Sequence, residues 1–405
     1  MKISGITLLT GSLLLCGSAY AQQEDTNAGQ MTDNEKSLVE EVFKLEKKTD
    51  KFNLYLNMQG DFQSDWTGSS FDGAKFRFKQ LRVEAKGQIN DWLSYRYRQR
   101  LNKGDTPSGY FDNVLQSIDI AGIGIDLKKW SFFLGKQCAA YGGIEFDLNP
   151  IEIYQYSDMV DYMSNFMTGI NIAYNFTPNQ QLQFQVLDAL TGSSKEMYGD
   201  YTPAKIPLLY TLNWNGNFND VYKTRWSASF MNETKGKHMW YFALGNDFKL
   251  SDKVDMYFDW LYSIEGVDRK GIITDIVAPN GWNKKAAKTD IMSFILHLNY
   301  RFHPSWNIFA KGMYENEGVY KTNTMDVLDA NGQETPVELR KGKYRTALGY
   351  IGGIEYYPFK DRNLHFFAAY VGRNYLYTKK AKSFGAEDYN TNSVQVGFIW
   401  QMPVF

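Results

Sequence analysis

Hydrophobic and polar residues alternate with a period of two along most of the chain. In FNLYLNMQGDFQ, residues 52–63, one face carries Leu54, Leu56, Met58 and Phe62, and the other carries Tyr55, Asn57, Gln59 and Asp61. This alternation predicts a β-strand with one apolar and one polar face. Similar segments bring the total to about sixteen, near residues 75–86, 93–101, 115–125, 131–137, 168–176, 182–189, 208–214, 222–232, 239–250, 254–264, 291–302, 307–315, 345–357, 364–377 and 393–405.

The connections between these segments fall into two classes. Short turns such as QINDW, TPNQQ and HPSW alternate with long loops near residues 138–167, 191–207, 266–288, 318–343 and 379–391. Outer-membrane barrels combine an even number of strands, short periplasmic turns and longer outer loops, with aromatic residues at both interfaces. Four tryptophans adjoin short turns: Trp92, Trp130, Trp214 and Trp306. We therefore predict an all-β fold, a transmembrane antiparallel β-barrel of about sixteen strands. A secreted β-sandwich is the alternative, because half-buried strands also alternate.

The first residues predict export to the outer membrane of a Gram-negative bacterium. Lys2, the apolar residues 6–16 and the small residues of SAYAQQ form a signal peptide pattern over residues 1–21. A lipid-modified Cys16 is the alternative. Residues 22–51 are predicted as a polar periplasmic segment with a short amphipathic helix. Alternating four- and three-residue steps place Leu38, Val42, Leu45 and Thr49 on one face of this helix. The barrel is predicted over residues 52–405.

Composition supports a barrel and excludes other classes. Aromatic residues make up 16% of the 405 residues although the mean hydropathy is −0.44, which suits strands that meet lipid on one face and water on the other. No apolar stretch after the signal reaches the roughly 18–20 residues of a membrane helix. The formal net charge of −1 argues against nucleic-acid binding. Cys138 is the single cysteine beyond the predicted signal peptide, so an intramolecular disulfide is excluded.

Basic residues share one face of two neighbouring predicted strands. In SYRYRQRL, residues 94–101, every second residue is an arginine, and on a barrel Arg96, Arg98 and Arg100 face the lumen while the residues between them face lipid. The preceding strand, KFRFKQLRVEAK, repeats the pattern with Arg77, Lys79 and Arg82, and its slip in parity predicts a β-bulge near Gln80. Arginine keeps its charge and binds oxyanions through a planar fork. These side chains are predicted to form a basic ladder that favours anions.

The long third loop offers a different role for these arginines. It is acidic, and its carboxylates are Glu145, Asp147, Glu152, Asp158 and Asp161. If the loop folds into the lumen, these carboxylates are candidate partners for the ladder, because buried charges need pairing. The same carboxylates leave a calcium site open as an alternative. No cofactor or resident metal is predicted.

The chain resembles the phosphate-selective porin O and P family, especially members from Bacteroidetes-type outer membranes. The resemblance rests on FRFKQLRVEAKG, DWLSYRYRQRL and FFLGKQCAAYGGIEFDLNP in this order, and on the terminal Phe405. It implies a barrel of 16 strands, commonly a homotrimer, whose third loop folds inward as a constriction. The basic ladder that it implies comprises Arg77, Lys79, Arg82, Arg96, Arg98, Arg100 and, at the base of the loop, Lys136. This chain departs from the pattern because residues 137–167 contain no Arg or Lys.

We therefore predict an outer-membrane porin, a barrel embedded in lipid whose water-filled channel lets small anionic or polar solutes diffuse passively, with an anion preference and phosphate-like ions as possible solutes. An outer-membrane enzyme and a receptor or adhesin acting through long loops are the alternatives. No catalytic residue is assigned, because the sequence contains no HExxH, GxSxG or GxxxxGK[ST]. The histidines beyond the signal are His238, His297, His303 and His365.

Overall fold

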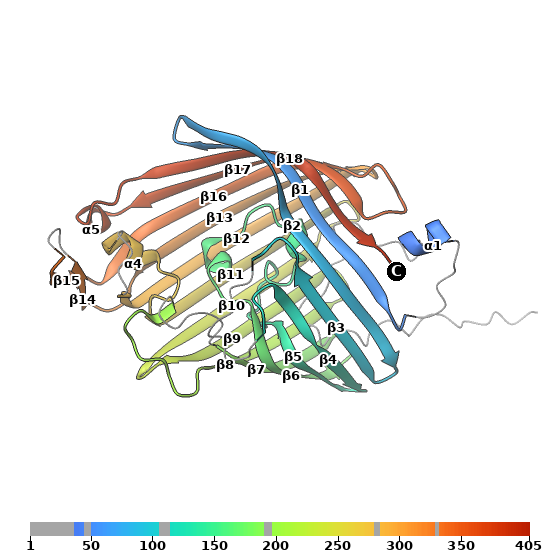
Figure 1. The fold of residues 1–405 in the computed structure, drawn as a ribbon, viewed down its shortest axis with the longest axis horizontal. Helices are drawn as coiled ribbons and strands as arrows, with labels where there is room; N and C mark the ends of the chain where they lie inside the picture. The colour runs from blue at the N-terminus through green and yellow to red at the C-terminus, as the bar shows by residue number, and fades with distance from the viewer. Residues whose placement is uncertain (1–35, 44–49, 105–113, 190–196, 279–283, 329–331) are drawn as a thin grey trace, which may run out of the picture.

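The computed structural model describes residues 36–43, 50–104, 114–189, 197–278, 284–328 and 332–405. Within them, sixteen antiparallel strands form a closed barrel in which β1 pairs with β18 (Figure 1). The barrel strands are β1 (Asn53–Thr67), β2 (Ser70–Asn90), β3 (Leu93–Arg100), β4 (Ile118–Leu127), β5 (Trp130–Cys138), β6 (Phe166–Thr177), β7 (Gln180–Asp188), β8 (Leu208–Phe218), β9 (Tyr222–Thr234), β10 (Lys237–Lys249), β11 (Val254–Val267), β12 (Ala287–His303), β13 (Trp306–Val319), β16 (Gly342–Tyr356), β17 (Leu364–Tyr377) and β18 (Tyr389–Pro403). The predicted barrel is confirmed, and the β-sandwich is excluded.

The faces of the first strands follow the period-two pattern. Asn57 and Gln59 of β1 are buried in the barrel, whereas Phe62 points outward and is 40% exposed. Between β1 and β2, Gln59 pairs with Gln80 but the next residue, Gly60, pairs with Phe78. Lys79 is therefore the additional residue of a β-bulge, which restores the inward direction of the basic side chains on both sides of it. The predicted bulge near Gln80 is confirmed.

The two ends of the barrel differ. One end carries the short turns, and the other carries the long loops with α4 (Ile272–Val277), α5 (Lys379–Lys382) and the hairpin of β14 (Asn323–Leu328) and β15 (Glu334–Leu339) (Figure 1). The long loops pack together, and against the ends of β13 and β16, through an apolar cluster: Ile273, Ile276, Val277, Ala286, Val319, Met325, Leu339, Tyr344 and Ala381. Among the described residues, no helix is long and apolar enough to cross a membrane.

The described part of the N-terminal segment lies at the end with the short turns. Helix α1 (Leu38–Phe43) lies close to the C-terminus (Figure 1). The backbone N–H of Val39 donates to the carbonyl of Val404 at 3.1 Å, and Glu41 pairs with Arg362. The predicted signal peptide and the helical positions Leu45 and Thr49 lie outside the described residues. The hydrogen bond to Val404 attaches helix α1 to the residue that follows the last barrel strand, β18.

Candidate functional site

The third loop, residues 139–165, lies inside the barrel. Most of its side chains from Ala139 to Val160 are buried, although they belong to a connection between two strands. Two short helical turns shape the loop: η1 (Pro150–Glu152), where the Asn149 side chain accepts from Ile151 N, and α2 (Asp158–Asp161), where the Ser157 side chain accepts from Val160 N. Both are N-cap contacts, which satisfy backbone donors that a short helix leaves open.

Apolar packing holds the loop against the barrel wall from β6 to β18. Tyr141, Phe146 and Met159 of the loop pack in one cluster with inward-facing apolar residues of the wall. The wall residues of this cluster run from β6 to β18 and include Met167, Leu187, Leu209, Met231, Met239, Tyr241, Leu261, Ile295, Phe309, Met313, Ile351 and Phe367. Each large side chain buried in this way contributes about 1.5–3 kcal/mol. The apolar packing of the loop therefore involves β6 to β18 and not β2 to β5.

Wall carboxylates bind the backbone of the loop. Asp259 on β11 accepts hydrogen bonds from Ile144 N at 2.7 Å and Glu145 N at 2.9 Å. Glu315 on β13 accepts from Asp158 N at 3.0 Å and Met159 N at 3.1 Å. Both carboxylates and their donors are buried, where a charge-assisted hydrogen bond is strong. Each pair of bonds fixes one end of the loop to the wall.

Loop carboxylates bind wall cations in return. Asp147 pairs with Arg225 on β9, where Arg225 Nη2 donates to Asp147 Oδ1 at 2.7 Å. Glu145 pairs with Lys311 on β13. Asp158 lies between two arginines, which also pair with wall glutamates, in the pairs Arg345–Asp158, Arg373–Asp158, Arg345–Glu317 and Arg373–Glu315. We call this group the Asp158 clamp.

The arginines of the predicted ladder face the lumen but pair with acids of the wall. Asp119 on β4 collects three of them, and the pairs are Arg82–Asp119 at 2.9 Å, Arg98–Asp119 at 3.5 Å, Arg100–Asp119 at 2.9 Å, Arg96–Glu84 at 2.7 Å and Arg77–Asp61 at 2.6 Å. The hypothesis that the loop carboxylates neutralise these arginines is therefore wrong for the pairs just given. The cations that pair with the loop carboxylates lie on β9, β13, β16 and β17.

The two predicted lysines donate to backbone carbonyls. Lys79, at the β-bulge, donates to the carbonyls of Ile153, at 2.8 Å, and Tyr154. Lys136 donates to the carbonyl of Leu115 at 3.3 Å. Lys79 is thus the member of the ladder that touches the third loop, and its bonds keep the loop from moving away from β2.

A gap separates the docked loop from the basic wall. We call it the ladder cavity; it encloses about 1130 Å³ of empty space, its open side included. Its lining residues are Gln80, Arg82, Arg100, Lys103, Gln116, Lys136, Pro150, Tyr156, Val160, Asp161, Met163, Ser164, Asn165 and Phe166. Three predicted ladder residues, Arg82, Arg100 and Lys136, therefore line it together with one predicted loop carboxylate, Asp161. Arg96 and Arg98 are buried, and Glu152 faces a different cavity.

Sequence reasoning missed the wall residues that receive the loop: Arg225, Asp259, Lys311, Glu315, Arg345 and Arg373. Each is a charge at an inward position of a strand segment that is rich in apolar residues, as in FAKGMYEN or YVGRNYL. An isolated inward charge among apolar neighbours was the available signal, because such a charge must find a partner. Among the described residues, no three His, Cys, Asp or Glu side chains gather closely enough to hold a metal ion.

Replacing Gly245 by alanine should loosen the loop. An added Cβ at Gly245, on β10, would lie 2.6 Å from Cα of Gly143 in the loop, and backbone cannot move aside as a side chain does. Overpacking of this kind typically costs about 1–3 kcal/mol. We expect higher single-channel conductance and a lower unfolding temperature for Gly245→Ala. Gly312→Ala is the matched control, because an added Cβ there has no atom within 4 Å; equal behaviour of the two variants would contradict the prediction.

Comparison with known proteins places these features in a family. The family model described as phosphate-selective porin O and P matches residues 52–402, which is most of the chain. No curated protein matches the chain.

Solved structures share the fold at low sequence identity. The outer membrane channel DcaP of Acinetobacter baumannii aligns with a TM-score of 0.56 and 13% identity, covering 86% of this chain and 96% of that one. OmpF of Salmonella typhi, in complex with daunomycin, aligns with a TM-score of 0.53 and 13% identity, covering 87% of this chain and 98% of that one. An anion-selective porin from Comamonas acidovorans aligns with a TM-score of 0.51 and 8% identity, covering 87% of this chain and 99% of that one. At these identities the likeness concerns the fold.

Proposed function

Because this chain belongs to the phosphate-selective porin O and P family and forms the closed barrel of an outer-membrane porin channel, we propose that its channel prefers anions. The observation that carries the proposal is the charge of the ladder cavity. Among the described residues that line it, Arg82, Arg100, Lys103 and Lys136 stand against one carboxylate, Asp161. Local charges at a narrow point determine the potential that a passing ion meets.

The ion pairs of the ladder reduce this positive charge without cancelling it. Asp119 is one carboxylate shared by Arg82, Arg98 and Arg100, so this group keeps a positive excess. Arg82 Nη1 is buried and has no hydrogen-bond partner among the described residues. All these groups lie within about a Debye length of 8–10 Å of the cavity, where salt screens them weakly. The proposal therefore depends on local charge and not on the net charge of −1.

We propose further that the third loop is the constriction of the pore. Its packing against the strands opposite to β2–β5 supports this, because it leaves the ladder cavity as the space beside the basic wall. The solute is proposed to be a small anion or a small polar molecule, with phosphate-like ions among the candidates. A carboxylate at Asp161 opposite the ladder favours weak, short-lived binding, which conduction needs.

The reversal potential tests the proposed selectivity. Purified protein in a planar bilayer with a tenfold KCl gradient should show single-channel steps. Its reversal potential should have the same sign as the equilibrium potential of chloride. A reversal potential of the cation sign would contradict anion preference. Reconstituted protein that folds but shows no conductance steps would favour the alternatives, an enzyme or a receptor acting through the long loops.

Several predictions about the organisation of the protein are retained as proposals. We propose that residues 1–21 are a signal peptide and that residues 22–51 form a periplasmic segment, which is supported by the position of α1 at the end with the short turns (Figure 1). A homotrimer in contact with outer-membrane lipids, and the absence of enzyme activity, are proposed from the family. Gel filtration with light scattering measures the oligomeric state directly.

A further inference from the structure

The lining of the ladder cavity is divided between charged and apolar side chains. The barrel wall supplies its cations, among them Arg82 on β2 and Arg100 on β3. The third loop supplies Pro150, Val160 and Met163, and the last two are 6% and 9% exposed. A solute in this space therefore meets cationic and apolar groups in one cavity.

Arg100 is held in place and still reaches the cavity. Its Nε forms the ion pair with Asp119 Oδ1 at 2.9 Å, and its Nη2 donates to the carbonyl of Gln116 at 3.2 Å. Its guanidinium group lies 6.0 Å from the ring centroid of Phe166. Its Nη1 donates to no described residue, and the side chain is 24% exposed. Arg100 thus offers an oriented and accessible donor to an anionic group.

The charges beside Arg100 suit a solute with one negative charge. Arg82 and Arg100 share the carboxylate of Asp119, at 2.9 Å each, so one positive charge remains between them. The two lysines of the lining have interactions of their own. Asp161, a loop residue of the same lining, opposes any second negative charge. A carboxylate meets these conditions, and its two oxygens match the planar fork of a guanidinium group.

The cavity has room for a solute with an apolar body. Its empty space of about 1130 Å³, the open side included, is not smaller than the about 300–1,000 Å³ of small-molecule sites. Tyr156 adds a ring to the apolar part of the lining and packs against the apolar cluster of loop and wall. A small hydrated ion gains nothing from Val160 and Met163, whereas an apolar body is stabilised when these side chains shield it from water.

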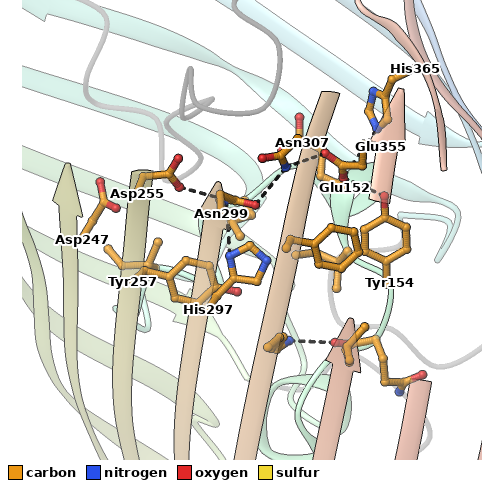
Figure 2. A pocket seen from close by; sticks show the side chains of 17 residues that line it. Glu152, Tyr154, Asp247, Asp255, Tyr257, His297, Asn299, Asn307, Glu355 and His365 are labelled. Carbon is orange, nitrogen blue, oxygen red and sulfur yellow. Dashed lines mark hydrogen bonds and ion pairs between the residues drawn. The ribbon is translucent and has the colours of Figure 1, made fainter. Parts of the chain in front are cut away.

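A second cavity borders the third loop and is lined by other residues (Figure 2). Among the described residues that line it, the one lysine, Lys311, pairs with Glu145 and donates to the carbonyl of Gln155 at 2.8 Å. Asn307 donates to Glu355 at 2.9 Å (Figure 2). Because the cation is already bound and Glu355 repels an anion, an organic anion is expected in the ladder cavity and not in this one.

We propose that the ladder cavity selects small organic carboxylates over inorganic anions. The carboxylate meets Arg100 in the positive field of Arg82. An apolar body, such as an aromatic ring, lies against Val160, Met163 and Tyr156. This inference rests on the proposed anion preference and specifies its solute, but binding of the carboxylate can be measured without conduction.

Calorimetry with benzoate as the probe tests the site in folded protein in detergent, at pH 7 and low chloride. Benzoate should bind saturably and at least about tenfold more tightly than acetate, which corresponds to about 1.4 kcal/mol. Benzyl alcohol has the ring without the charge, and inorganic phosphate has charge without the ring. Both should bind more weakly than benzoate.

Two variants locate the bound benzoate. Arg100→Gln removes the accessible guanidinium group, and Val160→Thr replaces a methyl group by a hydroxyl group at nearly constant shape. Each should weaken benzoate binding severalfold. The matched controls are Lys129→Gln, in the turn between β4 and β5, and Val221→Thr, in the turn between β8 and β9, because both side chains are exposed and outside the cavity. The controls should bind benzoate as the wild type does.

The other outcomes overturn the proposal. Absence of saturable benzoate binding, or acetate or phosphate binding as tight as benzoate, would show that the apolar lining selects nothing. Equal binding of benzyl alcohol would show that charge is not recognised. Unchanged benzoate affinity in both variants would place benzoate outside the ladder cavity. If a variant does not fold, the comparison of the four probes on the wild type decides.

The reversal potential in KCl separates this inference from the proposed anion preference. A reversal potential of the chloride sign, together with any of the contrary binding results, would exclude the organic carboxylate and leave the anion preference intact. A reversal potential of the cation sign, together with the expected benzoate binding, would exclude the anion preference and leave the binding site.

Discussion

Replacing Asp158 by alanine is expected to release the third loop from the wall and to raise the conductance of the channel. Asp158 is the loop carboxylate that both Arg345 and Arg373 contact, and all three side chains are buried. Removing one partner of a buried ion pair costs about 3–5 kcal/mol because the remaining charges stay buried. Here Glu317 and Glu315 keep one contact to each arginine, so we expect the low end of that range.

A loss of about 3 kcal/mol shifts the equilibrium between docked and undocked loop on the order of a hundredfold. Single-channel conductance should rise, and added protease should cut the loop of the folded barrel more readily. Asp252→Ala is the control: it removes an exposed carboxylate from the short turn between β10 and β11, outside the clamp and outside the lining of the ladder cavity. If Asp158→Ala assembles and keeps both the conductance and the protease resistance of the wild type, the clamp does not hold the loop.

Replacing Arg100 and Lys136 together by glutamine is expected to move the reversal potential toward the cation side. Both residues line the ladder cavity, and Arg100 is the more exposed of the arginines on Asp119. Arg82 and Arg98 remain to pair with Asp119, so this buried carboxylate keeps its cations and the barrel should assemble. We expect a shift on the order of 20 mV, out of the about 59 mV that a tenfold gradient sets for a univalent ion.

The control for this variant changes the same number of charges outside the lumen. Lys128 and Lys129 lie exposed in the turn between β4 and β5, next to the same wall. Their replacement by glutamine changes the net charge equally, so its reversal potential should stay at the wild-type value. A shift of equal size in both variants would mean that overall charge, and not the lining of the ladder cavity, determines selectivity. No shift in either would place the ladder cavity outside the permeation path.

The sequence by itself determined the strands, their faces and the closure of the barrel. A period of two is a local property, so alternation around Asn57 and Arg98 was sufficient to place both side chains in the lumen, and the parity slip around Lys79 was sufficient to predict the bulge. The signal weakened in the second half of the chain. In β10 the inward Tyr241 and the outward Trp240 are both apolar, so period alone did not reveal that half of the lumen is apolar.

Only the tertiary structure decided which charges meet. Asp158 and Arg345 are 187 residues apart, and so many lumen charges of both signs share one inward face that sequence spacing does not select the pairs. Barrel closure and the packing of the loop against apolar wall residues bring Asp158 to Arg345. Arg82 and Arg100 form their ion pairs with Asp119 of the neighbouring wall instead. The charge of each cavity thus depends on contacts between distant strands, because electrostatic energy follows distance in space and not along the chain.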